Sequence, residues 1–146
     1  MKKGYFALAL LLAGVTAAAS AEARDTRLFL PIEEAINAPE AENKLNPNIR
    51  LVFGEGVAEV SEEHGPVVTN RKTNAFNKTD EEACRWVMLS ALIALQERAR
   101  EQHANAVINI ESYYDQVEMS STSEYECHAG ALMAGVALKG DVVTLP

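Results

Sequence analysis

The residues of this sequence that could carry metal or redox chemistry are two cysteines and three histidines. They are Cys84, Cys127, His64, His103 and His128. Zinc and related metals are usually held by close pairs such as C-x-x-C or H-x-x-x-H, and neither spacing occurs. Cys127 and His128 are adjacent, but neighbouring residues of a strand point to opposite faces, so the pair is poorly suited to one ion. The sequence therefore predicts neither a metal site nor a cofactor.

Motifs for phosphate binding and for hydrolysis are incomplete. Gly130 and Gly135 have P-loop spacing in the run GALMAG, but Val136 and Ala137 follow where that motif requires lysine and then serine or threonine. No G-x-S-x-G occurs, and the paired glutamates of the chain are typical of solvated faces or helix caps. No mechanistic role has a placed candidate, so the sequence predicts no enzyme.

Two sets of residues could instead form an interaction surface: a short stretch of amides with one aromatic ring, and an apolar strip on a helix. The stretch is Asn74, Phe76 and Asn77, and the strip is Trp86, Leu89 and Ile93. Exposed aromatic rings beside amides suit recognition. The alternative is that Phe76 docks its loop into the core, and ordinary burial preferences favour that alternative.

The strongest predicted element is a helix from about Asp80 to about His103. Thr79 followed by Glu82 forms a capping box at its start. Apolar residues recur at i, i+3, i+4 spacing along one stripe, which contains Cys84, Val87, Met88, Ala91, Leu92, Leu95 and Ala99. The strip that begins at Trp86 lies on nearly the opposite side. A helix apolar on two faces is either sandwiched within its domain or buried against another chain.

Shorter extended segments surround this helix. We predict strands over residues 26–30, 49–53, 57–60, 67–69, 106–114, 124–138 and 142–145, with helical turns between 31 and 45. Alternation places Ala106, Ile108 and Ile110 on one face of their strand, Asn105 is predicted to end the helix in a left-handed conformation, and residues 139–141 are predicted to turn. The fold class is α+β: a small, mostly antiparallel sheet packed against one long helix.

The first 23 residues have the three regions of a secretory signal peptide. Lys2 and Lys3 precede the apolar run from Tyr5 to Val15, and small residues then lead to A-x-A sites ending at Ala21 and Ala23. A membrane anchor needs about 20 apolar residues, and no cysteine follows the run to accept a lipid. We therefore expect cleavage after one of these alanines, a periplasmic protein without stable membrane insertion, and a single α+β domain over residues 24–146.

The acidic composition of the chain argues against nucleic acid as a partner. The net charge is −8, and it becomes −9 when residues 1–23 are removed, because Lys2, Lys3 and Glu22 leave together. Such a surface repels phosphate backbones, and no local cluster of Lys and Arg compensates.

The two cysteines are predicted to form a disulfide. An even number of cysteines in an exported chain favours a bridge over free thiols. Cys84 lies on the main stripe of the helix, and Cys127 shares the core-facing side of the last strand with Tyr125, Ala129, Ala131 and Met133. The bridge would close a loop of more than forty residues, worth on the order of 4 kcal/mol in the chain-entropy model.

Two resemblances accompany these residues. The run AREQHANAVINI, residues 99–110, resembles the helix-to-strand signature of domains related to YbjQ and RcsF, although His103 stands where that signature has glycine. A longer match, through TNAFNKTDEEAC, SALIALQERA, YECHAGA and MAGVALKGDVV, resembles a family of uncharacterised exported proteobacterial proteins often labelled excinuclease ATPase subunit. The missing Walker lysine and the export signal contradict that label.

The resemblance implies an RcsF-like α+β fold. RcsF is a disulfide-containing sensor of envelope stress, but this chain lacks the lipoprotein cysteine and has two cysteines only. The YbjQ side implies a ring-forming oligomer and has been called metal-binding. We therefore expect a non-catalytic periplasmic protein in envelope homeostasis or stress, which binds an envelope protein or a small ligand. The alternative is a homo-oligomeric structural or metal-binding periplasmic protein.

Overall fold

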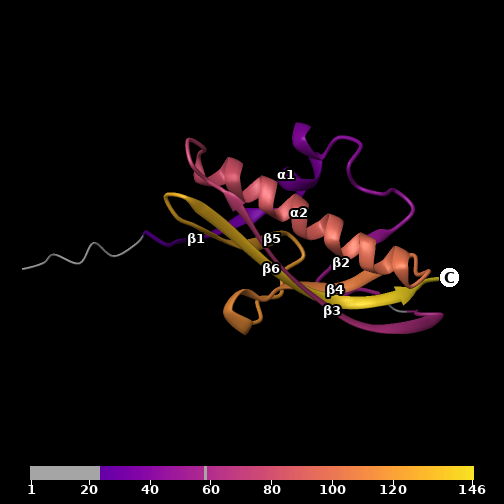
Figure 1. Ribbon diagram of the computed structural model, residues 1–146. Coiled ribbons are helices and arrows are strands. Elements are labelled where there is room, and N and C mark those ends of the chain that lie inside the picture. Colours follow the sequence, from indigo (N-terminus) through magenta and orange to yellow (C-terminus); the bar gives the residue numbers. More distant parts are fainter. Residues whose placement is uncertain (1–23, 58) are drawn as a thin grey trace, which may run out of the picture.

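The computed structural model describes residues 24–57 and 59–146, so the predicted signal peptide lies outside the described residues. The elements follow in the order β1 (Thr26–Pro31), α1 (Ile32–Asn37), a 3-10 turn (Pro39–Ala41), β2 (Arg50–Phe53), β3 (Glu62–Asn74), α2 (Asp80–Glu101), β4 (Ala106–Ser112), a second 3-10 turn (Tyr114–Gln116), β5 (Glu124–Ala129) and β6 (Met133–Thr144). Figure 1 shows α2 lying across a curled sheet. The predicted α+β class is confirmed.

Strand β6 is the centre of the sheet. It pairs with β3 along nearly its whole length, from Met133 to Thr144. Its other edge is shared, because β5 pairs with its first residues and β4 with residues 138–143. Strand β1 extends the sheet beyond β5, and β2 extends it beyond β4. The pairing of β2 with β4 is parallel and the other pairings are antiparallel, as expected for a mostly antiparallel sheet.

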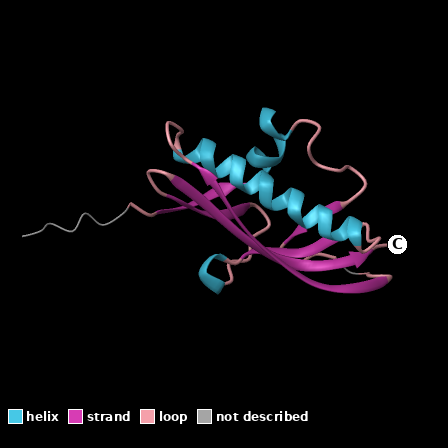
Figure 2. Ribbon diagram, viewed as in Figure 1, coloured by secondary structure: helices cyan, strands magenta, loops and turns pink. Residues whose placement is uncertain are grey.

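Helix α2 covers one face of this sheet (Figure 2). The Thr79 hydroxyl accepts a hydrogen bond from the Glu82 backbone N–H at 3.1 Å, which caps the first turn. The predicted apolar stripe is buried against alternate residues of β4, β5 and β6, among them Val107, Cys127, Val136, Leu138 and Val142. Removing this apolar surface from water is the main driving force for the packing.

The second side of α2 is covered by the chain's own residues. The polar residue Gln96 is buried on this side of the helix. Its amide accepts from Asn46 N–H at 2.8 Å and donates to the carbonyls of Asn46 and Ile49 at 3.0 and 2.9 Å. These bonds hold the segment after α1 against α2, and α1 itself contacts the helix. The helix is therefore sandwiched within its own domain.

The end of α2 differs from the prediction. His103, not Asn105, has the left-handed conformation, with φ of 56°. The Ala104 N–H then donates to the Ala99 carbonyl at 2.9 Å, which satisfies a free carbonyl of the last turn. The Asn105 side chain instead forms two hydrogen bonds with the backbone of Leu145. Its Nδ2 donates to the Leu145 carbonyl, and its Oδ1 accepts from the Leu145 N–H.

Strand β3 is longer than the sequence suggested. Only residues 67–69 were predicted as a strand here, but residues 62–74 form one 13-residue strand, because β6 offers continuous hydrogen-bond partners. Pro66 is tolerated because β3 has a free edge. The strand predicted over 57–60 is absent from the described residues there: Val57 and Val60 lie outside the strands and pack on a second, small cluster with Ile108 and Val143.

The alternation predicted for β4 is also wrong. Asn109 has a left-handed φ of 53°, and the pairing with β6 shifts register between Ile108 and Glu111. A bulge adds one residue and moves the following side chains to the other face. Ile110 therefore joins Val107 beneath α2, while Ile108 packs on the opposite face.

The last predicted strand is divided into two. Residues 130–132 form a turn between β5 and β6, so Ala131 and Met133 are exposed instead of core-facing. The predicted turn at 139–141 is wrong, because β6 continues through it. Gly140 is required there by close packing: a Cβ at this position would lie 2.9 Å from Val107 Cγ1 and 3.0 Å from the Ile108 carbonyl oxygen.

Candidate functional site

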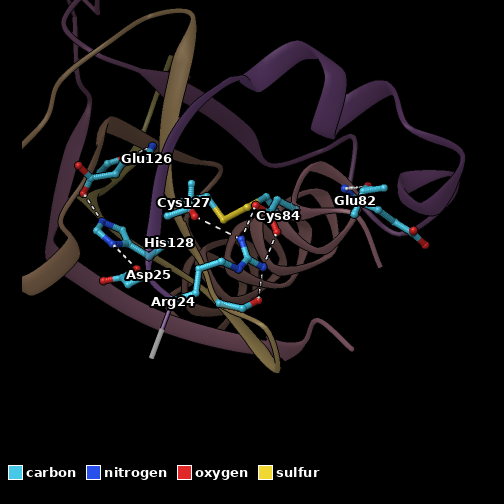
Figure 3. The surroundings of a disulfide bond; sticks show 12 residues. Arg24, Asp25, Glu82, Cys84, Glu126, Cys127 and His128 are labelled. Carbon is cyan, nitrogen blue, oxygen red and sulfur yellow. Dashed lines mark hydrogen bonds and ion pairs between the residues drawn. A yellow bond between two sulfur atoms is a disulfide. The ribbon is translucent and has the colours of Figure 1, made fainter. Parts of the chain in front are cut away.

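The two cysteines are joined across the dry interior between α2 and β5 (Figure 3). The Cys84 and Cys127 sulfur atoms are 1.99 Å apart, and both residues are completely buried. Reactive thiols are partly exposed and stabilised as thiolates by positive groups. A buried bridge between core residues is instead a structural link, and here it ties the start of α2 to β5.

His128 lies on the opposite face of β5 from the disulfide, as strand alternation requires. Its Nδ1 is 3.2 Å from Asp25 Oδ1, and its Nε2 is 3.3 Å from Glu126 Oε2 without hydrogen-bond geometry. The Tyr114 ring stacks on the imidazole, with centroids 3.6 Å apart and an interplanar angle of 7°. Burial raises the pKa of Tyr114 above its ordinary value. Figure 3 shows His128 between the two carboxylates.

The position of Tyr114 also explains why residue 135 is glycine, one of the two glycines with P-loop spacing. Gly135 pairs with His128 across β5 and β6, and a Cβ on it would lie 3.2 Å from Tyr114 Cε2. The glycine therefore makes room for an aromatic ring over the sheet. A phosphate loop joins a strand to a helix, whereas GALMAG joins two antiparallel strands.

A second polar network lies on the same open face around Lys139. The Lys139 ammonium contacts Glu118 and lies 3.2 Å from Glu111 Oε1 and 5.0 Å from the centre of the Tyr113 ring. The hydrogen bonds to the two glutamates raise the pKa of Lys139. A polar hollow of about 570 Å³ lies beside this network. Its lining includes Gly54, Glu55, Val57, Val68, Asn109, Ser120 and Asp141.

The predicted apolar strip on α2 does form a surface feature. Trp86, Leu89 and Ile93 line a groove of about 320 Å³. Leu89 forms its floor, because only 2 % of it is exposed, while Trp86 and Ile93 are half-buried. The remaining lining residues are Lys44, Arg71, Ser90, Ala94 and Glu97. We call these eight residues the α2 groove.

Two cations, Lys44 and Arg71, lie among the residues that line the α2 groove. The Lys44 ammonium lies 4.5 Å from the centre of the Trp86 ring, a geometry in which the ring face attracts a positive charge. Arg71 reaches the groove from β3. Glu97 contributes one negative charge. The groove can therefore accept an apolar side chain between two positive groups.

The predicted stretch before α2 is separate from this groove. Asn74 and Asn77 are exposed, and Phe76 is 59 % exposed, so this ring does not dock into the core. Asn74 Oδ1 accepts from the Phe76 N–H at 2.8 Å, which shapes the loop, and Asn77 has a left-handed φ of 58°. The alternative of a buried Phe76 is wrong.

The open-face residues were missed by sequence reasoning. Glu111, Lys139 and Tyr113 belong to different elements, and only the register of β4 on β6 brings them together. Glu126 and His128 gave one usable signal: these two polar residues alternate with Tyr125, Cys127 and Ala129 on β5. Tyr114, which completes their cluster, comes from a distant turn.

The described part of the chain contains no group of three His, Cys, Asp or Glu side chains placed to hold a metal ion. His64 bonds Thr144 Oγ1 at 2.8 Å, and His103 lies at the end of α2. Within residues 24–57 and 59–146, no helix has the length and apolar character needed to cross a bilayer. Comparisons of the chain with protein-family models, curated proteins and solved structures found no match.

Proposed function

We propose that this chain is an exported, periplasmic, non-catalytic interaction protein, and that the α2 groove binds an envelope protein. The observation that carries the proposal is the groove itself: a buried apolar floor at Leu89 with the cations of Lys44 and Arg71 on its rim. Lys and Arg are outnumbered by Asp and Glu, 13 to 21, on this chain. Their placement at an apolar groove suits a partner segment that offers one apolar side chain between acidic residues.

Export is the second part of the proposal. The signal-peptide pattern of residues 1–23 and the Cys84–Cys127 bridge support it together, because structural disulfides persist in oxidising compartments. The RcsF- and YbjQ-like pattern around residues 99–110 supports a role in envelope homeostasis. His103 adopts the left-handed conformation at the position where that pattern has glycine, which agrees with the proposed RcsF-like fold.

Three groups with shifted pKa values are not suited to act as a general base or an activated nucleophile. The pKa values of Tyr114, Tyr125 and Lys139 are all raised, by burial for the tyrosines and by Glu118 and Glu111 for the lysine. A general base or an activated nucleophile needs a pKa near the working pH. These shifts move the three groups further from neutral pH and keep them protonated.

A photo-crosslinking residue at Ser90, inside the α2 groove, tests the proposal. A matched control places the same residue at Arg98, which is exposed on α2 outside the groove. We expect one envelope protein, identified by mass spectrometry, to be captured from Ser90 and not from Arg98. Charge reversal by Lys44→Glu with Arg71→Glu should reduce that capture at least fivefold. Equal capture from both positions, or capture that ignores the charge reversal, would contradict the proposal.

Further measurements distinguish this proposal from the homo-oligomeric and metal-binding alternatives. A self-crosslink from Ser90 together with a multiple of the monomer mass in light scattering would favour an oligomer. The oligomer was suggested because a helix that is apolar on two faces can be buried against another chain. That reason is weakened, because the segment that contains Asn46 and Ile49 is hydrogen-bonded to α2 within the same chain. Native mass spectrometry after incubation with Zn²⁺, Cu²⁺ or Ni²⁺ would reveal a bound metal ion.

A further inference from the structure

Strand β3 forms one edge of the sheet. It pairs with β6 along one side, and no other described strand pairs with its second side. Figure 1 shows β3 beside β6 at the margin of the sheet. A free strand edge presents a row of backbone N–H and C=O groups that have no partners. The edge of β3 can therefore serve as a template for a further strand.

The register shows which backbone groups of β3 face this free edge. The Ala75 N–H donates to the Leu132 carbonyl at 2.8 Å, and the pairing of β3 with β6 continues from there to Pro66 without a shift. In an antiparallel pair every second residue bonds to the partner strand, so the residues between them face outward. These outward residues are Pro66, Val68, Asn70, Lys72 and Asn74. Pro66 agrees with this assignment, because a proline within a sheet turns the side that lacks an N–H to the free edge.

The free edge of β3 lies beside the α2 groove. Side chains of a strand alternate between the two faces of a sheet, and Arg71 reaches the groove from between the outward residues Asn70 and Lys72. On the open face, Val68 and Asn70 line a hollow of about 430 Å³, together with Tyr113, Asp115, Gln116 and Ala137. A strand added to β3 would therefore direct alternate side chains towards the α2 groove and towards this hollow.

The charges beside the edge favour an acidic strand. Between Pro66 and Asn74 the charged residues of β3 are Arg71 and Lys72. Neither of these cations, nor Lys44 in the α2 groove, forms an ion pair with another described residue. The negative groups that line the groove and the open-face hollow are Glu97 and Asp115. Acidic side chains on an added strand would complement the cations of the edge and the groove.

A second copy of this chain is poorly suited to supply that strand. The strands at the other two edges of the described sheet are β1 and β2. The charged residue of β1 is Arg27, and the charged residue of β2 is Arg50. Each free edge therefore carries cations, as β3 does at Arg71 and Lys72. Like charges on paired strands are destabilising, and cations on an edge oppose pairing between identical sheets.

We propose that the partner bound at the α2 groove supplies an extended, acidic segment that joins the sheet as an additional strand beside β3. In such an addition, backbone hydrogen bonds provide affinity and alternate side chains provide specificity. The segment carries an apolar residue for the α2 groove and an acidic residue two positions to each side, because these three side chains share one face. The inference rests on the proposed function and specifies how that partner is bound.

A proline at the free edge tests the added strand. Asn70→Pro removes an outward N–H, at an edge that already contains Pro66, and leaves the residues of the α2 groove unchanged. The matched control Asn70→Ala removes the same side chain and keeps the N–H. We expect capture of the envelope partner by the crosslinker at Ser90 to fall at least fivefold with Asn70→Pro and to change less than twofold with Asn70→Ala. Equal capture by the two variants would overturn the added strand and leave the proposed function of the α2 groove intact.

Amide hydrogen exchange, followed by NMR on the processed protein, needs neither the proline variant nor a captured partner. The probe is a synthetic peptide in which threonine alternates with glutamate, leucine and glutamate, and the control peptide has lysine in place of both glutamates. In the free protein the amides of Val68, Asn70 and Lys72 should exchange faster than those of Thr69 and Arg71, which bond to β6. Saturating acidic peptide should slow exchange of the outward amides at least tenfold, and the lysine peptide should not.

Three results of this exchange measurement would overturn the proposal. They are the absence of protection at millimolar acidic peptide, equal protection by the two peptides, and protection of the outward amides by self-association, seen as a dependence on protein concentration without peptide. None of them would affect the crosslinking at Ser90, which tests the proposed function separately.

Discussion

The two faces of the sheet are stabilised by different kinds of contact. The face beneath α2 packs a large apolar cluster around the Cys84–Cys127 bridge. The open face carries the His128 cluster, on which Tyr114 stacks, and the Lys139 network. It also carries a small apolar cluster against which Val57 and Val60 pack. The hydrophobic contacts of the helix-covered face are non-directional. The polar clusters of the open face depend on specific hydrogen-bonding and charged partners. Stability should therefore reside mainly beneath α2, and the open face can vary more freely.

The largest expected effect concerns the bridge. Its two residues are separated by 43 positions, so a double Cys84→Ala and Cys127→Ala variant frees a long loop in the unfolded chain and leaves a small cavity. We expect the free energy of unfolding to fall by about 4 kcal/mol. Urea unfolding of the oxidised, reduced and variant proteins measures this. Two free thiols in the denatured, non-reduced protein would show that the bridge does not form.

Truncation of a core residue compares the two faces directly. Leu92 is completely buried on the sheet-facing side of α2, and Val68 is 59 % exposed on the open face. Leu92→Ala should lower the free energy of unfolding by about 3 kcal/mol through lost burial and a cavity, and Val68→Ala by about 0.5 kcal/mol or less. Chemical denaturation gives both values. Similar losses at the two sites would refute the assignment of stability to the helix-covered face.

Tyr125 is a polar exception on the helix-covered face. It is 1 % exposed, and no described residue forms a hydrogen bond with its hydroxyl. Burial raises its pKa, with Arg85 opposing and Glu34 adding to the shift. Removal of the hydroxyl in Tyr125→Phe should therefore change the free energy of unfolding by about 1 kcal/mol or less, towards greater stability.

The pH dependence gives a second check on Tyr125. Because the folded-state pKa is raised, the folded protein retains a proton that the unfolded chain loses near pH 10. Stability of the parent chain should fall as pH rises through that region, and the Phe variant should lose part of this slope. Parallel curves for the two proteins would mean that the hydroxyl is solvated in the folded state.

The smallest effect is expected at the exposed ammonium of Lys139 on the open face. Because Glu118 and Glu111 raise its pKa, its contribution should be complete below the ordinary lysine pKa and disappear as pH rises through the raised value. Lys139→Met should lower the melting temperature slightly at low salt, and the difference should shrink at high salt because exposed pairs are screened. A large, salt-independent loss would place the network among the main stabilising features.

Local patterns correctly predicted the elements that carry a strong period or cap. The i, i+3, i+4 stripe and the Thr79 cap gave α2 almost to its ends, and the same stripe placed Cys84 opposite Cys127. The apolar strip within the α2 groove was also predicted, since Trp86, Leu89 and Ile93 share one side of the helix. These features depend on residues within a few turns of each other, so the local sequence contains the necessary information.

The remaining features depended on partners distant in the sequence. Strand β3 is polar over much of its length and is extended because β6 pairs with it. The bulge at Asn109 moves the following side chains of β4 to the other face of the sheet. An alternation pattern in the sequence does not predict a single left-handed residue. The His128 cluster and the Lys139 network each join side chains from separate elements.

What the sequence by itself determined is the class of fold, the long capped helix and the pair of sulfurs in the core. What only the tertiary structure decided is the strand register, and with it which polar side chains meet on the open face. The physical reason is the separation in sequence over which each interaction acts. Helix periodicity and capping act between residues a few positions apart. Sheet pairing depends on competition among strands that are distant in sequence for the same hydrogen-bonding edge.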